Sequence, residues 1–103
     1  MPRITIRLSE PALTDLENIR IWYADQDVPH IGIRFLTEIL ERISLLRDNP
    51  QMGRIVPEFG QPTLRELIHP PFRIVYRKEK SRLQIIRVWR SERMLRLEAE
   101  DPE

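Results

Sequence analysis

The sequence contains no cysteine, two histidines and three isolated glycines. Without cysteine the chain has no disulfide framework, no thiolate metal ligand and no thiol nucleophile. The histidines, His30 and His69, lie far apart in sequence, and no close pair of carboxylates accompanies either, which argues against a metal site. None of the glycines opens the strand-to-helix turn of a phosphate-binding loop. The sequence therefore predicts neither a metal nor a cofactor.

Long hydrophobic runs are also missing. No apolar stretch approaches the roughly 18 residues that a membrane helix needs, so no membrane span is predicted. The opening residues "MPRITIRLSEP" alternate apolar and polar side chains and lack the apolar segment of a secretory signal. We therefore expect a cytoplasmic protein, and the absence of cysteine agrees with that expectation. A chain of 103 residues has room for one compact domain.

Acidic residues are scarce in the C-terminal half. Between positions 54 and 96 there are eleven Arg or Lys against four Glu, whereas the last six residues, "EAEDPE", contain four acids. We expect one domain over residues 1–97 and an acidic, flexible tail over 98–103. Of the 17 basic residues 15 are arginine, whose planar guanidinium suits bidentate contact with carboxylate or phosphate. This bias favours binding to an anionic partner; the alternative is a solvated surface that reflects genome composition.

The hydrophobic periodicity predicts one strand, two helices and three further strands. Alternating apolar residues precede Ser9, and apolar residues then recur at helical spacing. The expected elements are a strand ending near Ser9, helices over 10–26 and from Pro29 to about 48, and strands over 63–69, 72–77 and 82–89. This order predicts an α+β domain of two layers, β-α-α-β-β-β, with a helical hairpin on one face of a mainly antiparallel four-stranded sheet.

The last hairpin separates apolar from basic side chains if a four-residue turn closes it. One face then carries Phe72, Ile74, Tyr76, Leu83, Ile85 and Trp89. The other face carries Arg73, Arg77, Arg82, Gln84 and Arg90. Arg87 falls on the apolar face in this register. We expect either a register shifted by one residue or a carboxylate or sheet edge that Arg87 reaches. Arg65 joins the basic face if the register of its own strand allows.

Several segments resemble one protein family. They are "ALTDLENIRIWY" in the first predicted helix, the pattern "P…GR…PE" in the loop, and then "LREL" and "FRIVY". In these segments and in the order of its elements, the chain is similar to the RelE/ParE toxins of bacterial type II toxin–antitoxin modules. The resemblance implies the same β-α-α-β-β-β fold.

The superfamily contains two functional branches. RelE-like members cut mRNA on the ribosome, using lysines before the "RIVY" motif, the arginine of that motif, and a Tyr or His-Tyr pair near the C-terminus. Arg73 matches the motif arginine. Arg65 and Glu66 stand where the lysines would be, and after Tyr76 there is neither Tyr nor His. The resemblance therefore implies a ParE-like poison of DNA gyrase with no catalytic residues. The alternative is an mRNA interferase that uses Arg73, Glu58 and Arg90.

In the ParE-like interpretation the arginines bind partners instead of catalysing a reaction. The implied partners are DNA gyrase and a ParD-like antitoxin, with a homodimer or a heterotetramer with antitoxin as the assembly. A third interpretation is a family member without toxicity, or one that binds nucleic acid directly. We expect Arg73→Ala to weaken antitoxin binding more than it destabilises the domain. The expected partner-binding residues are Arg65, Arg73, Arg77, Arg90 and Arg93.

Overall fold

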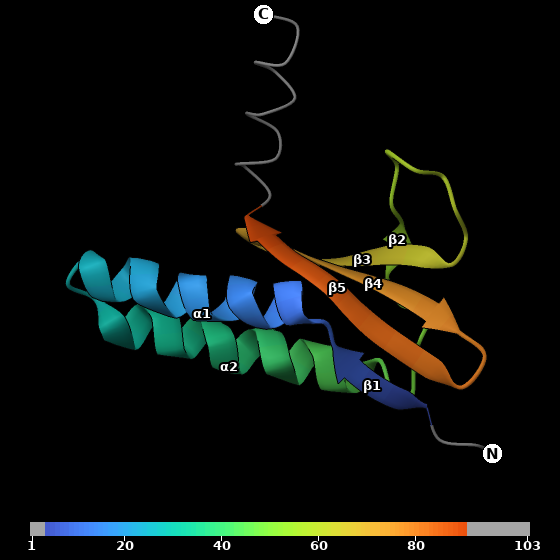
Figure 1. Cartoon of the computed structure of the whole chain (residues 1–103), viewed down its shortest axis with the longest axis horizontal. Coiled ribbons are helices and arrows are strands. Elements are labelled where there is room, and N and C mark those ends of the chain that lie inside the picture. Colours follow the sequence, from blue (N-terminus) through green and yellow to red (C-terminus); the bar gives the residue numbers. More distant parts are fainter. Residues whose placement is uncertain (1–3, 91–103) are drawn as a thin grey trace, which may run out of the picture.

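The computed structural model describes residues 4–90, in which two helices cover one face of a five-stranded sheet (Figure 1). The strand order across the sheet is β1-β5-β4-β3-β2. The elements are β1 (Thr5–Leu8), α1 (Glu10–Asp25), α2 (Pro29–Leu45), β2 (Arg54–Ile55), β3 (Leu64–His69), β4 (Phe72–Glu79) and β5 (Arg82–Arg90). The predicted two-layer α+β architecture is confirmed.

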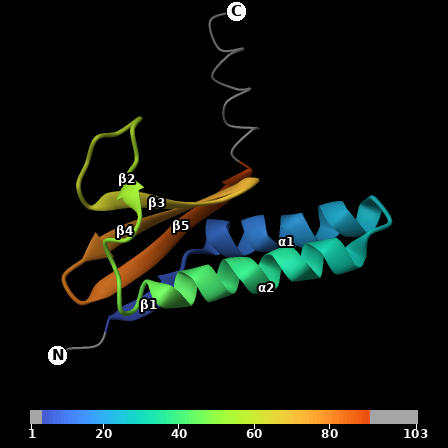
Figure 2. The same cartoon turned by 180° about the vertical axis from the view of Figure 1, so that it is seen from behind.

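The first helix begins where the sequence predicts. Ser9 has extended backbone angles, and its Oγ accepts a hydrogen bond from the Ala12 N–H at 3.1 Å. This bond satisfies one of the amide groups that a helix leaves unpaired at its start. Pro11 occupies the first turn, where its missing N–H costs no intrahelical bond. The two helices lie side by side along the sheet, as Figure 2 also shows from behind.

The main core fills the space between the helices and the sheet. It contains one apolar stripe from each helix and the inward side chains of β3, β4 and β5. Its buried members are Ala12, Leu16, Ile19, Tyr23, Ile39, Ile43, Leu46, Leu67, Phe72, Ile74, Tyr76, Leu83, Ile85 and Val88. We call the covered side of the sheet the helix face and the other side the open face.

The sheet has one strand more than the sequence predicts. Arg54 pairs with Glu66 and Ile55 pairs with Arg65 in antiparallel register, so the loop that was expected to be irregular contains the short strand β2. A strand of two residues has no period that a sequence pattern could reveal. At the opposite edge β1 pairs with β5 in parallel, and the remaining pairs are antiparallel.

A β-bulge changes the predicted faces of β5. Close to the turn the predicted faces are correct, because Tyr76 lies opposite Ile85 and Arg77 lies opposite Gln84. The turn between β4 and β5 has two residues instead of four, so the paired residues differ from those that a four-residue turn would give. The register then shifts between Val75 and Tyr76. Because one extra residue reverses the alternation of side chains, Trp89 lies on the open face and Arg90 on the helix face. The predicted positions of these two residues are therefore wrong.

Neither described helix is long and apolar enough to cross a membrane.

Candidate functional site

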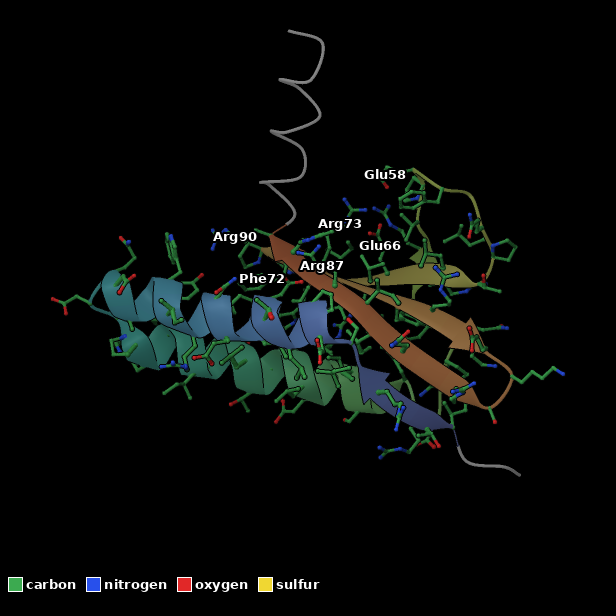
Figure 3. All side chains as sticks on the ribbon, viewed as in Figure 1. Glu58, Glu66, Phe72, Arg73, Arg87 and Arg90 are labelled. Carbon is green, nitrogen blue, oxygen red and sulfur yellow. The ribbon has the colours of Figure 1, made fainter. Side chains whose placement is uncertain are left out.

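Four charged side chains form a continuous chain on the open face of the sheet, and Figure 3 labels three of them, Glu58, Glu66 and Arg73. Arg54 Nε donates to Glu66 Oε2 at 2.7 Å, and Arg73 Nε donates to Glu66 Oε1 at 2.7 Å. Arg73 Nη1 and Nη2 also donate to the two oxygens of Glu58 at 3.2 and 3.1 Å. We call these four residues, Arg54, Glu66, Arg73 and Glu58, the arginine–glutamate chain. Its two cations and two anions balance.

Burial differs sharply along the arginine–glutamate chain. The Glu66 side chain is 0% exposed and that of Arg73 is 8% exposed, whereas Glu58 retains 34% and Arg54 61%. Burial alone lowers the pKa of the Arg73 guanidinium, but the hydrogen bonds and charges of Glu58 and Glu66 outweigh it and raise the pKa. Arg73 is therefore a fixed cation whose hydrogen bonds are directed at its own domain.

Apolar side chains surround this chain on the open face. Val56, Leu64 and Val75 are buried there, and Ile86 and Trp89 pack against them. The guanidinium of Arg87 lies over the Trp89 ring, 4.8 Å from its centroid, which is the geometry of a cation–π contact. The open face thus has a small core of its own below the arginine–glutamate chain.

The structure separates Arg77 from Arg65, whose place on the basic face depended on the register of its own strand. Arg77 pairs with Leu64 and Gln84, lies on the open face with Arg73, and is half-buried. Arg65 lies opposite Tyr76, on the other side of the sheet. There its guanidinium donates to the Gly53 carbonyl at 2.9 Å and to the Pro62 carbonyl at 3.1 Å. Arg65 therefore anchors a loop and does not extend the basic open face.

Arg90 also lies away from the open face. It pairs with Phe72, and its Nη1 donates to the Tyr23 hydroxyl at 3.2 Å. Its guanidinium lies 5.2 Å from the ring centroid of Trp22 and 5.7 Å from that of Phe72. Arg93, the fifth expected partner-binding arginine, is outside the described residues. Among residues 4–90 the predicted arginines therefore occupy two faces and do not form a single surface.

Of the three residues that a ribonuclease would use, the structure brings two together. Glu58 and Arg73 form the bidentate pair described above, and Arg90 lies on the helix face. His69 Nε2 lies 3.0 Å from Glu38 Oε1, so the histidine is engaged with α2. Within residues 4–90 no group of three or more His, Asp and Glu is placed to hold a metal ion.

Asp15 is a site residue that the sequence did not reveal. Its carboxylate accepts from Arg87 Nε at 2.7 Å, from Arg87 Nη2 at 2.9 Å and from the Val88 N–H at 2.9 Å. Pairing with β1 stops at Ile85, so the edge of β5 beyond that residue needs another acceptor. The one hint in the sequence was Arg87, which the predicted register placed on the apolar face. In the structure the register is shifted and Arg87 also reaches a carboxylate. The hydrogen bond with Asp15 raises the pKa of Arg87.

Replacing Asp15 by alanine is expected to destabilise the domain by about 2 kcal/mol, because charge-assisted hydrogen bonds to Arg87 and to the β5 edge are lost. We expect less than for a fully buried pair, since the Arg87 side chain is 37% exposed. Urea denaturation measures the loss. The control is Glu17→Ala on the same helix, which removes an exposed ion pair with Arg20 and should leave the midpoint unchanged. Equal midpoints for both variants would contradict the prediction.

The loop between α2 and β3 is anchored by a buried tyrosine. The Tyr76 hydroxyl accepts from the Gly53 N–H at 3.0 Å and donates to the Pro50 carbonyl at 2.8 Å. Burial raises the pKa of this hydroxyl, and the hydrogen bond from Gly53 partly opposes that shift. Together with the Arg65 contact to Gly53, these bonds fix the start of the loop against the sheet.

The fold and the sequence both match known toxins. A solved structure described as the chromosomal ParDE TA system from P. aeruginosa superposes with a TM-score of 0.72, is 24% identical, and matches over 84% of this chain and 95% of that chain. This likeness shows that the two chains share a fold. The family model for the ParE toxin of the type II toxin–antitoxin system parDE matches residues 6–95. The chain therefore belongs to the ParE toxin family. A comparison with curated protein sequences finds no match.

Proposed function

We propose that this chain is a toxin that poisons DNA gyrase and is neutralised by a ParD-like antitoxin. The observation that carries the proposal is the match to the ParE family over residues 6–95. The proposal places the activity in binding, so it needs surfaces on the domain and no catalytic residues.

The geometry around Arg73 supports binding over RNA cleavage. A ribonuclease needs a cation that can reach the scissile phosphate, together with an acid and a base, and each positioned acid or base contributes about 10²–10⁴-fold to the rate. Arg73 is 8% exposed, and its nitrogens already donate to Glu66 and Glu58. Arg90, the other expected cation, lies on the opposite face of the sheet. An mRNA interferase would have to break the arginine–glutamate chain before using Arg73.

The open face suits an antitoxin segment that carries both carboxylates and apolar side chains. Ile68 of β3 is 37% exposed on this face, and Trp89 and Ile86 of β5 are partly exposed on the same face. Arg77 lies on the same face, and within residues 4–90 no hydrogen bond or ion pair of its guanidinium occurs. An acidic side chain of the antitoxin can pair with Arg77 while apolar neighbours cover Trp89.

The test is a gyrase assay with the pure protein and supercoiled plasmid. We expect the toxin to trap a cleaved-DNA complex and to inhibit supercoiling, and we expect the antitoxin of the same module to reverse both effects when added first. Toxin preincubated with its antitoxin is the control. Unchanged supercoiling, together with cuts in translated mRNA found by primer extension after induction, would instead assign the chain to the mRNA interferases.

A further inference from the structure

The loop after β2 presents one aromatic side chain to solvent. Phe59 is 59% exposed, the highest fraction among the large exposed apolar side chains of the described residues. The backbone of this tip is closed by two hydrogen bonds, because the N–H groups of Phe59 and Gly60 both donate to the Val56 carbonyl, at 3.1 and 2.9 Å. Gly60 adopts φ +63°, a left-handed conformation that suits glycine. The tip therefore has one defined turn geometry.

The residues beside Phe59 are anchored to the sheet. Val56 is 2% exposed and packs in the apolar cluster of the open face. Glu58, directly before Phe59, makes its bidentate contact with Arg73, and Arg73 is in turn bonded to the fully buried Glu66. One end of the arginine–glutamate chain thus fixes the position of an exposed phenylalanine.

Stability alone does not explain why two charged side chains are buried here. Taking Glu66 and Arg73 out of water carries a large desolvation penalty, and well-packed apolar residues at such positions are often as stabilising or more so. Here the buried charges support a loop whose apolar tip lies in solvent. An aromatic side chain held in place before binding loses little entropy on docking, and aromatic residues are frequent among the side chains that dominate binding energy.

We propose that Phe59 is a docking residue for gyrase, and that it inserts into an apolar pocket on the surface of that folded protein. The inference rests on the proposed function and adds the surface of the toxin that engages the target. The shape of the tip favours this occupant. A projecting side chain needs a concave partner, which a folded protein supplies, whereas an extended antitoxin segment needs a groove or a sheet face.

The decisive experiment compares Phe59→Ala with Ile33→Ala. Ile33 lies on α2 and is 57% exposed, so its variant removes a similarly exposed apolar side chain from the helical layer. We expect Phe59→Ala to need about tenfold or more toxin for the same yield of trapped gyrase complex, as for an interface hot spot. Its melting temperature and antitoxin affinity should equal those of the wild type, and Ile33→Ala should match the wild type in all three measurements.

A second variant tests the anchor. Glu58→Gln keeps the size of the side chain but removes its charge and one of the two oxygens that accept from Arg73, so the loop is anchored more weakly while Phe59 is retained. We expect its potency against gyrase to fall between those of the wild type and Phe59→Ala. Reduced potency of Glu58→Gln, which retains Phe59, would show that the position of the phenylalanine matters as well as its presence.

The other outcomes overturn the inference in distinguishable ways. Wild-type potency of Phe59→Ala, with an active wild type, would refute the docking role alone. Reduced antitoxin affinity with unchanged potency would assign the tip to the antitoxin. A wild-type protein that traps no gyrase complex would refute the proposed function, and the inference would fall with it.

Discussion

Replacing Arg73 by alanine is expected to lower the free energy of unfolding by about 3–5 kcal/mol, the usual cost of removing one partner from a buried ion pair. The Glu66 side chain is 0% exposed, and without Arg73 it keeps only the hydrogen bond from Arg54. Glu58 also loses the two hydrogen bonds that Arg73 donates to it. A small domain is stable by about 5–15 kcal/mol, so this loss is a large fraction of the total.

The measurement is urea denaturation of Arg73→Ala beside Arg77→Ala. Arg77 lies on the same strand and the same face, and its variant should shift the midpoint little because its charge is not part of the arginine–glutamate chain. A double variant, Arg73→Met with Glu66→Leu, should recover much of the loss, since it removes both buried charges together. Equal stability of the Arg73→Ala and Arg77→Ala proteins would contradict a structural role for Arg73.

This expectation reverses the one that the sequence supports. From the sequence, Arg73 is an arginine on a basic face with few acids nearby, so its loss should affect partner binding most. The structure shows that Glu66 and Glu58 are directed at this one side chain. Glu66 comes from the neighbouring strand, and Glu58 comes from a loop. The distance in sequence between these residues hid a pairing that the sheet brings about.

The layers could be predicted because they depend on local periodicity. Each helix has one apolar stripe, and the strands near the termini alternate, so the order of elements and the two-layer packing followed from the pattern. Two features had no such signal. The strand β2 consists of Arg54 and Ile55 alone, and its pairing depends on the distant β3. The bulge opposite Val75 and Tyr76 has no signal in the composition, yet it exchanges the predicted faces of Trp89 and Arg90.

The candidate site could be predicted only in part. The face of Arg73 and Arg77 was correct, because the β3–β4 pairing is regular and the extra residue of the bulge lies in β5 and not in β4. The position of Arg65 depends on the register of β3, which the short turn between His69 and Phe72 does not reveal in the sequence. Asp15 belongs to a helix whose outer side is polar, and nothing in that pattern distinguishes it from its neighbours. Side chains that meet across the two layers could therefore be identified only from the three-dimensional structure.

The loop that presents Phe59 is held by polar contacts at both of its ends. At one end Tyr76 binds the Gly53 amide and the Pro50 carbonyl, and at the other Glu58 binds Arg73. Both anchors are on β4, the strand at the centre of the sheet order. A strand that holds both ends explains how an exposed tip can keep a defined position.

Replacing Gly53 by alanine is therefore expected to cost about 3 kcal/mol, at the upper end of the usual range for overpacking. A Cβ at this position would lie 2.6 Å from the Tyr76 hydroxyl oxygen and 2.7 Å from the Glu66 carbonyl oxygen. Neither can move freely, because Tyr76 is fully buried and the carbonyl belongs to the backbone of β3. Relieving the contacts must separate the loop from the sheet, which breaks the Gly53–Tyr76 hydrogen bond.

Thermal unfolding of Gly53→Ala, with Gly60→Ala as the matched control, tests this account. A Cβ on Gly60 meets no atom within 4 Å, so its cost comes from the left-handed backbone alone and should be about 1–2 kcal/mol. The double variant Gly53→Ala with Tyr76→Phe should recover only part of the loss, because the contacts with the Glu66 carbonyl at 2.7 Å and with the Cε1 ring carbon of residue 76 at 2.8 Å remain. If Gly53→Ala had the same melting temperature as the wild type, the close approach of loop and sheet at this position would be wrong. If Gly53→Ala trapped less gyrase than the wild type at a temperature where both proteins are folded, the contact between Gly53 and Tyr76 would also position Phe59.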